Sequence, residues 1–336
     1  MASSSVWLIW AVVIVALLFD YINGFHDTAN SIATTVLTGA LSIPWAIALA
    51  ASLNFLGAFM SKCVATTIGK GIVDPSKINL QTVMAALIGA IAWNLITWRK
   101  GLPSSSSHAL IGGIVGAVAA RHGFGDFHWA GLKLIGLALL ISPILGFIVG
   151  NLAMVATYWI FRRTAPGKLN RWFKIFQILS ASSMAISHGG NDAQKTMGLI
   201  TMALVAGGFV VPEGGAFPIP LWVVIGCASA MAMGTAAGGW RIIKTVGRKV
   251  LCLQPVHGFA AETSGAAVIF AATAFGAPVS TTHVISSAIM GVGSSQGLKG
   301  VRWSIVKQIV SAWILTLPAS ALMAALVSWV FFHLFP

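Results

Sequence analysis

Two short polar motifs, each set inside a long apolar segment, hold the side chains best suited to chemistry. The first is Gly24-Phe25-His26-Asp27-Thr28-Ala29-Asn30, and the second is Gly189-Gly190-Asn191-Asp192-Ala193-Gln194-Lys195. Each places a carboxylate within a few residues of amide and imidazole or ammonium groups. Carboxylate and amide oxygens are hard ligands that suit small cations and protons. The two motifs, centred on Asp27 and Asp192, therefore suit a small cation or a proton.

Two hydroxyl-rich motifs follow downstream and suit an anion. They read Pro103-Ser104-Ser105-Ser106-Ser107-His108 and Pro278-Val279-Ser280-Thr281-Thr282-His283. Each precedes a glycine-containing apolar segment, so each predicts the start of a helix, where unpaired N–H groups and the helix dipole bind oxyanions. The candidate anion ligands are the hydroxyls of Ser105, Ser106, Ser107, Ser280, Thr281 and Thr282. In a plainer interpretation, these runs are only N-caps of the helices, and His108 and His283 only form hydrogen bonds with nearby backbone.

Two further carboxylates stand inside apolar segments. Glu262 lies in Phe259-Ala260-Ala261-Glu262-Thr263-Ser264-Gly265, and Asp20 precedes the first motif. Ionisable residues at membrane depth are costly and are functional candidates by default. Two roles stay open for Glu262, a proton relay or a structural pair with Lys195. Asp20 is interpreted as a structural hydrogen-bond acceptor.

The composition is that of a membrane protein. The chain has 336 residues, of which 57% are hydrophobic and 8% are charged, and its mean hydropathy is +0.89. Soluble domains carry about 25% charged residues, so this chain lacks the charges to cover a water-facing surface. Intrinsic disorder is excluded on the same grounds. A secreted disulfide scaffold is excluded because the three cysteines, Cys63, Cys227 and Cys252, are far apart and show no CxxC spacing. The net charge of +13 is attributed to basic cytoplasmic loops, and no nucleic-acid partner is expected.

Ten apolar segments are predicted to lie in the bilayer. The first is interrupted at 23–30 and the sixth at 188–195, where the polar motifs are expected to break the helix. Segments 104–120 and 279–295 are short enough to be re-entrant half-helices. The ten segments are 6–42, 44–61, 80–98, 104–120, 132–161, 175–206, 221–239, 253–276, 279–295 and 306–333. The first is interpreted as a transmembrane helix and not as a cleaved signal peptide.

The motifs occur in the same order in two halves of the chain. Residues 1–161 form the first repeat, 162–174 a basic cytoplasmic linker, and 175–336 the second repeat. Five segments in each half imply opposite orientations, with both chain termini outside. The sequence thus predicts an all-α polytopic membrane protein of two inverted-topology repeats, whose broken or re-entrant helices meet near the midplane.

The four motifs in this order resemble the inorganic phosphate transporter (PiT) family over nearly the whole chain. The family pattern is a duplicated G-A-N-D-V-A-N-A motif with Pro-x-Ser-x-Thr-His segments downstream, and the compact form resembles the bacterial low-affinity branch. The resemblance implies a cell-membrane symporter of inorganic phosphate, assembled as a homodimer and driven by protons or sodium. It also implies that Asp27, Asn30, Asp192 and the two hydroxyl runs surround the ions.

Two departures from the family pattern bear on the coupling ion. His26 replaces the first asparagine of the first motif, and Lys195 replaces the second asparagine of the second motif. The Lys195 ammonium can act as a tethered cation in place of one sodium ion, pair with Asp192 and face the anion. We therefore predict proton coupling through His26, Asp27 or Glu262, with no other cofactor. Relatives with the Gln-Lys variant further suggest phosphate carried as a complex with a divalent metal.

Other functions remain as alternatives. The nearest are a sulfate permease of the same family and a sodium-coupled phosphate symporter, and a remote one is an anion channel. An enzyme is not expected, because the chain has no Gly-x-Ser-x-Gly elbow and no HExxH motif. Duplicated polar motifs would also have no use in a single catalytic triad.

Overall fold

The computed structural model describes the chain except for residues 1, 213–216, 239–252, 296, 298–299 and 335–336. Its described part is helical, with one short 3-10 helix (Pro75–Lys77) and no strand. The helices are α1 (Ala2–Leu37), α2 (Ile43–Gly57), α3 (Cys63–Gly71), α4 (Leu80–Lys100), α5 (Ser106–His122), α6 (Trp129–Phe161), α7 (Pro166–Ala206), α8 (Leu221–Ala237), α10 (Pro255–Ala274), α11 (Thr281–Ser294) and α12 (Trp303–Leu334). The prediction of an all-α protein is confirmed.

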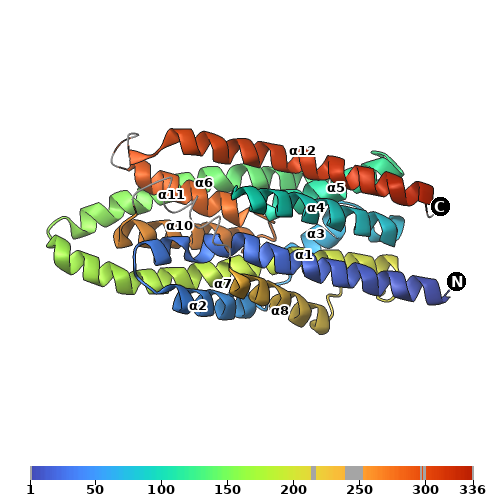
Figure 1. Ribbon diagram of the computed structural model, residues 1–336, viewed down its shortest axis with the longest axis horizontal. Coiled ribbons are helices and arrows are strands. Elements are labelled where there is room, and N and C mark those ends of the chain that lie inside the picture. Colours follow the sequence, from blue (N-terminus) through green and yellow to red (C-terminus); the bar gives the residue numbers. More distant parts are fainter. Residues whose placement is uncertain (1, 213–216, 239–252, 296, 298–299, 335–336) are drawn as a thin grey trace.

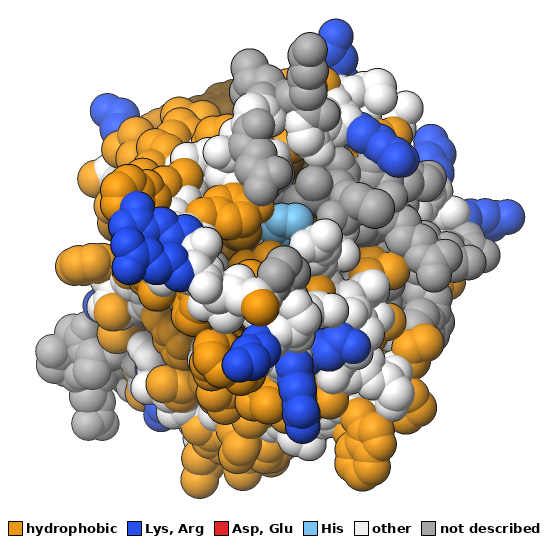
Figure 2. Space-filling view, turned by 90° about the vertical axis from the view of Figure 1, so that its left-hand side faces the viewer, with side chains coloured by type: hydrophobic (Ala, Val, Ile, Leu, Met, Phe, Trp, Pro, Cys, Tyr) orange, Lys and Arg blue, Asp and Glu red, His pale blue; other side chains and the backbone are white. Residues whose placement is uncertain are grey.

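The helices run mainly along the long axis of an elongated bundle, and both chain termini lie at the same end (Figure 1). Four of them, α4, α6, α12 and residues Val6–Leu37 of α1, are long and apolar enough to cross a membrane. The turn between α6 and α7 lies at the opposite end, where lysine and arginine side chains are visible without any acidic side chain (Figure 2). The predicted linker 162–174 is mostly helical, because α7 already begins at Pro166.

The predicted interruptions at 23–30 and 188–195 are wrong, since α1 and α7 are continuous through both polar motifs. The motif side chains find partners on neighbouring helices, so the backbone keeps its own hydrogen bonds. Gly24 and Gly189 allow this close approach. A Cβ on Gly24 would lie 2.3 Å from the Met231 carbonyl oxygen of α8, and one on Gly189 would lie 2.1 Å from the Asn54 carbonyl oxygen of α2.

The chain leaves the helical conformation just before each hydroxyl-rich motif, between α4 and α5 and between α10 and α11. Gly101 and Gly276 have φ values of 65° and 66° and end the preceding segments. Helices α5 and α11 then begin at N-caps Ser105 and Ser280. With 17 and 14 residues, they are about 25 and 21 Å long, less than the ~30 Å of a hydrocarbon core. The predicted short helices are therefore present.

Most of the buried apolar residues that the structure describes form two separate clusters, with a polar layer between them. On α1, residues Ile9–Phe19 belong to the first cluster and Ala29–Ala33 to the second. On α7, residues Ala193–Leu204 belong to the first and Phe173–Ala185 to the second. Helices α1 and α7 thus cross both clusters, and the two Asp-containing motifs lie in the layer where the clusters meet.

We expect Gly189→Ala to destabilise the protein, because the new methyl group would collide with backbone of α2. Overpacking of this kind typically costs about 1–3 kcal/mol. Gly136→Ala on α6 is the matched control, since a Cβ there meets nothing within 4 Å. Thermal unfolding of the detergent-purified variants followed by tryptophan fluorescence measures the difference. Equal unfolding temperatures for the two variants would contradict the close α2–α7 contact.

Candidate functional site

A buried ion pair lies at the centre of the molecule. The Lys195 ammonium contacts Oδ1 of Asp192, one turn earlier on α7. It also donates to Ser107 Oγ (2.6 Å) on α5 and to the carbonyl oxygen of Val279 (2.8 Å), just before α11. The expected pairing of Lys195 with Asp192 is confirmed. All three hydrogens of the ammonium have an acceptor, so one charge joins α7 to the start of both short helices.

The carboxylate of Asp27 lies on the opposite side of the same polar layer. Its Oδ1 lies 2.8 Å from Nδ1 of His26 and accepts a hydrogen bond from Thr282 Oγ1 (3.3 Å). Its Oδ2 accepts a longer one from Ser106 Oγ (3.5 Å). Asn30 donates to the same Thr282 hydroxyl (2.9 Å). Asp27 thus contacts both α5 and α11 from α1, whereas Asp192 on α7 contacts α11 directly and is joined to α5 through Lys195.

The N-termini of α5 and α11 meet between these two carboxylates. Ser107 Oγ donates to the carbonyl of Val279 (2.9 Å), and Thr281 Oγ1 donates to Asp192 Oδ2 (2.9 Å). The rings of His108 and His283 lie 4.5 Å apart, centroid to centroid. Two helix dipoles therefore direct their positive ends at one point, a suitable environment for an oxyanion.

The six predicted hydroxyl residues divide into two groups. Ser105 and Ser280 are N-caps that accept from the backbone N–H of His108 and His283, so the plainer interpretation holds for these two. The other four hydroxyls, those of Ser106, Ser107, Thr281 and Thr282, contact the motif carboxylates or Lys195.

Glu262 lies in a separate cluster, and its predicted pair with Lys195 is wrong. Its carboxylate accepts hydrogen bonds from four side chains, Thr34 (2.5 Å), Thr35 (2.8 Å), Gln177 (3.1 Å) and Ser180 (2.5 Å). Thr34 lies seven residues after Asp27 on α1, a rise of about 10 Å along the helix axis. Glu262 is thus connected to the central site through α1 and α7 and does not touch it.

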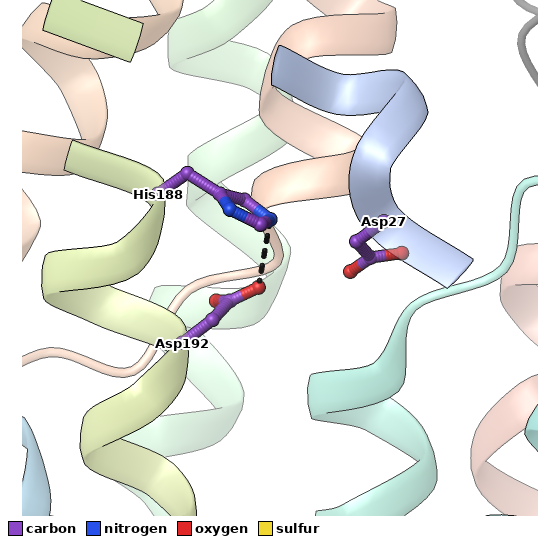
Figure 3. A group of neighbouring side chains, drawn as sticks. All are labelled: Asp27, His188 and Asp192. Atoms are coloured by element: carbon purple, nitrogen blue, oxygen red, sulfur yellow. Dashed lines mark ion pairs between the residues drawn. The ribbon is translucent and has the colours of Figure 1, made fainter. Parts of the chain in front are cut away.

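His188 is a site residue that the sequence did not single out. Its Nε2 lies 3.3 Å from Asp192 Oδ2, and its Nδ1 lies 3.1 Å from Asn54 Oδ1 of α2. One ligand atom each from Asp27, His188 and Asp192 lies within 4.8 Å of the others (Figure 3). Its spacing of four residues from Asp192 was the available signal, because i and i+4 share a helix face.

The assembled site is closed to solvent and rich in charge. Asp27, Asp192 and Lys195 are each at most 2% exposed, and the four site hydroxyls are at most 3% exposed. Buried charges of this kind must be paired or must bind ions. The arrangement combines hydroxyl donors, an ammonium and two helix N-termini for an anion with two carboxylates and an imidazole for a cation or proton.

Comparisons with known proteins identify the family of the chain. The chain matches the phosphate transporter family over residues 23–324. It is 48% identical to a "Probable low-affinity inorganic phosphate transporter" of Rhizobium meliloti over 95% of both chains. It is 50% identical to a protein of the same name from Bacillus subtilis over 94% of both chains.

A solved structure also shares the whole fold. It is described as "The sodium-dependent phosphate transporter", with a TM-score of 0.90 and 26% sequence identity, and the match covers 98% of this chain and 100% of that one. These relatives are named as transporters, a class that is not enzymatic. The chain is therefore a multi-pass protein of the bacterial cell membrane that belongs to the phosphate transporter family.

Proposed function

We propose that the protein imports inorganic phosphate by proton symport and that phosphate binds between the N-termini of α5 and α11. The observation that carries this proposal is the Lys195 ammonium, which is held at these two N-termini by Ser107 and the Val279 carbonyl. Phosphate oxygens would accept from Lys195 and from the hydroxyls now directed at Asp27 and Asp192. Desolvation of the anion is then offset by fixed donors and a buried positive charge.

Selection of phosphate over sulfate follows from the second carboxylate. Phosphate at neutral pH carries a P–OH group, whereas sulfate carries no proton. Asp27 can accept that hydrogen, because its Oδ2 is engaged only by a long hydrogen bond from Ser106. Sulfate would instead bring two like charges together without a bridging proton. This argument favours phosphate over the sulfate alternative.

Proton coupling is proposed because Lys195 supplies a fixed positive charge beside Asp192. A sodium ion at the same position would repel the ammonium. Sodium coupling remains the second candidate, since the solved structure with the same fold is named sodium-dependent. His26, Asp27 and Glu262 are the groups proposed to exchange the proton.

The substrate is proposed to include, in some cases, a divalent metal bound to the phosphate. The donor set fits such a cargo, because one ligand atom each from Asp27, His188 and Asp192 lies within 4.8 Å of the others. In addition, no described residue donates a hydrogen bond to the buried Oδ1 of Asn30. Imidazole and carboxylate are common ligands of divalent metals. Asp27, Asp192 and His188 would hold the metal while the hydroxyls hold the phosphate.

Transport is proposed to follow alternating access between two inverted repeats. Helix packing supports this symmetry. Helix α5 packs on α12 as α11 packs on α6, and α1 packs on α8 as α7 packs on α2. The proposal places the basic end of Figure 2 in the cytoplasm, in agreement with the positive-inside rule. We also propose that the protein is a homodimer, as the family resemblance implies.

Uptake of labelled phosphate into sodium-free proteoliposomes tests the proposal. We expect an inward proton gradient to drive accumulation above equilibrium, and excess sulfate to leave it unchanged. Strong competition by sulfate would indicate that the protein is a sulfate permease. Accumulation only after sodium is added would refute proton coupling. Flux that does not saturate and never exceeds equilibrium would indicate a channel.

Glu262→Gln is expected to remove the acceleration of uptake by a proton gradient, because an amide keeps the size of the carboxyl group but cannot release a proton. Exchange of labelled for unlabelled phosphate at equal pH should persist, since Glu262 does not touch the central site. Initial rates of phosphate uptake, measured at several pH values inside and outside the proteoliposomes, test this expectation. Unchanged pH dependence in this variant would exclude Glu262 from the proton path.

A further inference from the structure

The carboxylate of Asp20 is buried, and no described residue donates to it a hydrogen bond of good geometry. The residue is 0% exposed, and both of its carboxylate oxygens lack such a partner. The interpretation of Asp20 as a structural hydrogen-bond acceptor stays a prediction, because the side chains beside the carboxylate include groups that could donate to it. Its polar neighbours are Asn23 on the same helix, Thr196 on α7 and Cys227 on α8. The side-chain oxygens of Asn23 and Thr196 are also buried without such a partner.

Among the residues that the structure describes, no basic side chain forms an ion pair with this carboxylate, and the like charge of Asp192 adds to the cost of its burial. None of the ion pairs among the described residues involves Asp20, and the Lys195 ammonium on α7 is already bound to Asp192. Cys227 is the one titratable residue of α8. Helix α4, the third element against α1, carries charge only at Arg99 and Lys100 in its last turn.

The two carboxylate oxygens of Asp20 and the side-chain oxygens of Asn23 and Thr196 beside them point to a bound positive charge. An uncompensated carboxylate at membrane depth is costly, and the cost is removed when a cation or a proton neutralises it. Carboxylate, amide and hydroxyl oxygens are the donors that hard cations prefer. The thiol of Cys227, a poor ligand for such cations, closes the cluster on the side of α8.

The cluster is continuous with the phosphate site. Asp20, Asn23 and Asp27 follow one another at intervals of three and four residues, so they share one face of α1. Thr196 lies four residues after Asp192 on α7. Asp20 lies about 10 Å from Asp27 along the axis of α1. It lies toward the N-terminus of the helix, whereas the α1 residues that contact Glu262 lie toward the C-terminus.

We infer that Asp20, Asn23 and Thr196 form a binding site for one monovalent cation, a proton or a sodium ion, that couples to phosphate transport. The inference rests on the proposed function and adds a site to it. The cation would bind on the side of the chain termini and neutralise Asp20 before the carrier changes conformation. Without the cation, the Asp20 carboxylate would remain charged and buried while the carrier passes through its closed conformation.

The test compares wild type with Asp20→Asn in proteoliposomes. One arm applies a proton gradient without sodium, and the other applies a sodium gradient at equal pH. We expect Asp20→Asn to lose accumulation of labelled phosphate with whichever gradient drives the wild type. Its exchange of labelled for unlabelled phosphate without a gradient should remain at the wild-type rate. Asp20→Glu should restore accumulation, because it restores the carboxylate.

Thr201→Val on α7 is the matched control. Its buried hydroxyl only donates to the Met197 carbonyl of the same helix, so accumulation should persist. Normal accumulation by Asp20→Asn would overturn the inference. A folded Asp20→Asn that also loses exchange would overturn it too, since Asp20 would then act on phosphate itself. If Asp20→Asn does not fold, Thr196→Val takes its place, with the same expected loss.

A binding measurement separates this inference from the proposed function. Phosphate-free protein in detergent is assayed for bound ²²Na⁺, and for bound protons by potentiometric titration. We expect wild type to bind one cation more than Asp20→Asn, whether or not phosphate is transported. Equal binding of both cations by the two proteins would exclude the site. Absence of phosphate exchange by wild type would refute only the proposed function.

Discussion

Lys195→Asn is expected to abolish proton-driven phosphate uptake and to make the remaining uptake depend on sodium. The ammonium now bound to Asp192, Ser107 and the Val279 carbonyl would be replaced by a neutral amide. Asp192 would be left buried without its partner, a change that typically costs about 3–5 kcal/mol. A sodium ion beside Asp192 can recover part of that energy. Uptake at fixed pH with increasing external sodium measures the effect.

Two further variants make the result interpretable. Lys77→Asn changes the same residue type where the side chain is 59% exposed, and it should leave uptake unchanged. The double variant Lys195→Met with Asp192→Asn removes both charges together. It should fold, because no unpaired charge remains, but should bind no phosphate. Proton-driven uptake that survives in Lys195→Asn, without any sodium dependence, would show that the tethered-cation hypothesis is wrong.

Asp27→Asn is expected to lower phosphate uptake at least about tenfold, because a hydrogen bond to a charged group is worth about 1.5–3 kcal/mol. The amide keeps the shape of the side chain but cannot take up the P–OH hydrogen. It also removes the charge that faces Nδ1 of His26 at 2.8 Å. Discrimination between phosphate and sulfate should fall together with the rate. Competition of sulfate against labelled phosphate measures both quantities.

Asp126→Asn is the matched control for this substitution. The Asp126 side chain is 31% exposed, and its nearest basic groups, on Lys77 and His122, are 3.8 Å away. Such weak, exposed pairs contribute little. If Asp27→Asn transports phosphate like Asp126→Asn and rejects sulfate equally well, Asp27 has no role in recognising the anion.

The polar residues of the site could be predicted because membrane segments make them conspicuous. A charged residue in a segment as apolar as α1 has few structural uses, so Asp27 and Asp192 were evident without coordinates. The duplicated hydroxyl runs likewise predicted the starts of α5 and α11. Family resemblance supplied the substrate, which spacing and composition alone did not identify.

The continuity of α1 and α7 could not be predicted in the same way. Glycines and polar residues in a row favour an interrupted helix when each segment is considered alone. The helices stay regular because partners from other helices satisfy the motif side chains, as Thr282 does for Asn30. The contacts of Glu262 with Thr34 and Ser180 join residues more than 80 positions apart and depend on tertiary packing. Sequence spacing carries no information on such contacts.

A map of the protein saturated with phosphate, compared with one of the phosphate-free protein under the same conditions, tests the proposed binding site most directly. We predict tetrahedral difference density between the N-termini of α5 and α11, within hydrogen-bond distance of Lys195 and of the hydroxyls of Ser107 and Thr281. Density elsewhere in the bundle, with this position unchanged at saturating phosphate, would contradict the proposed site.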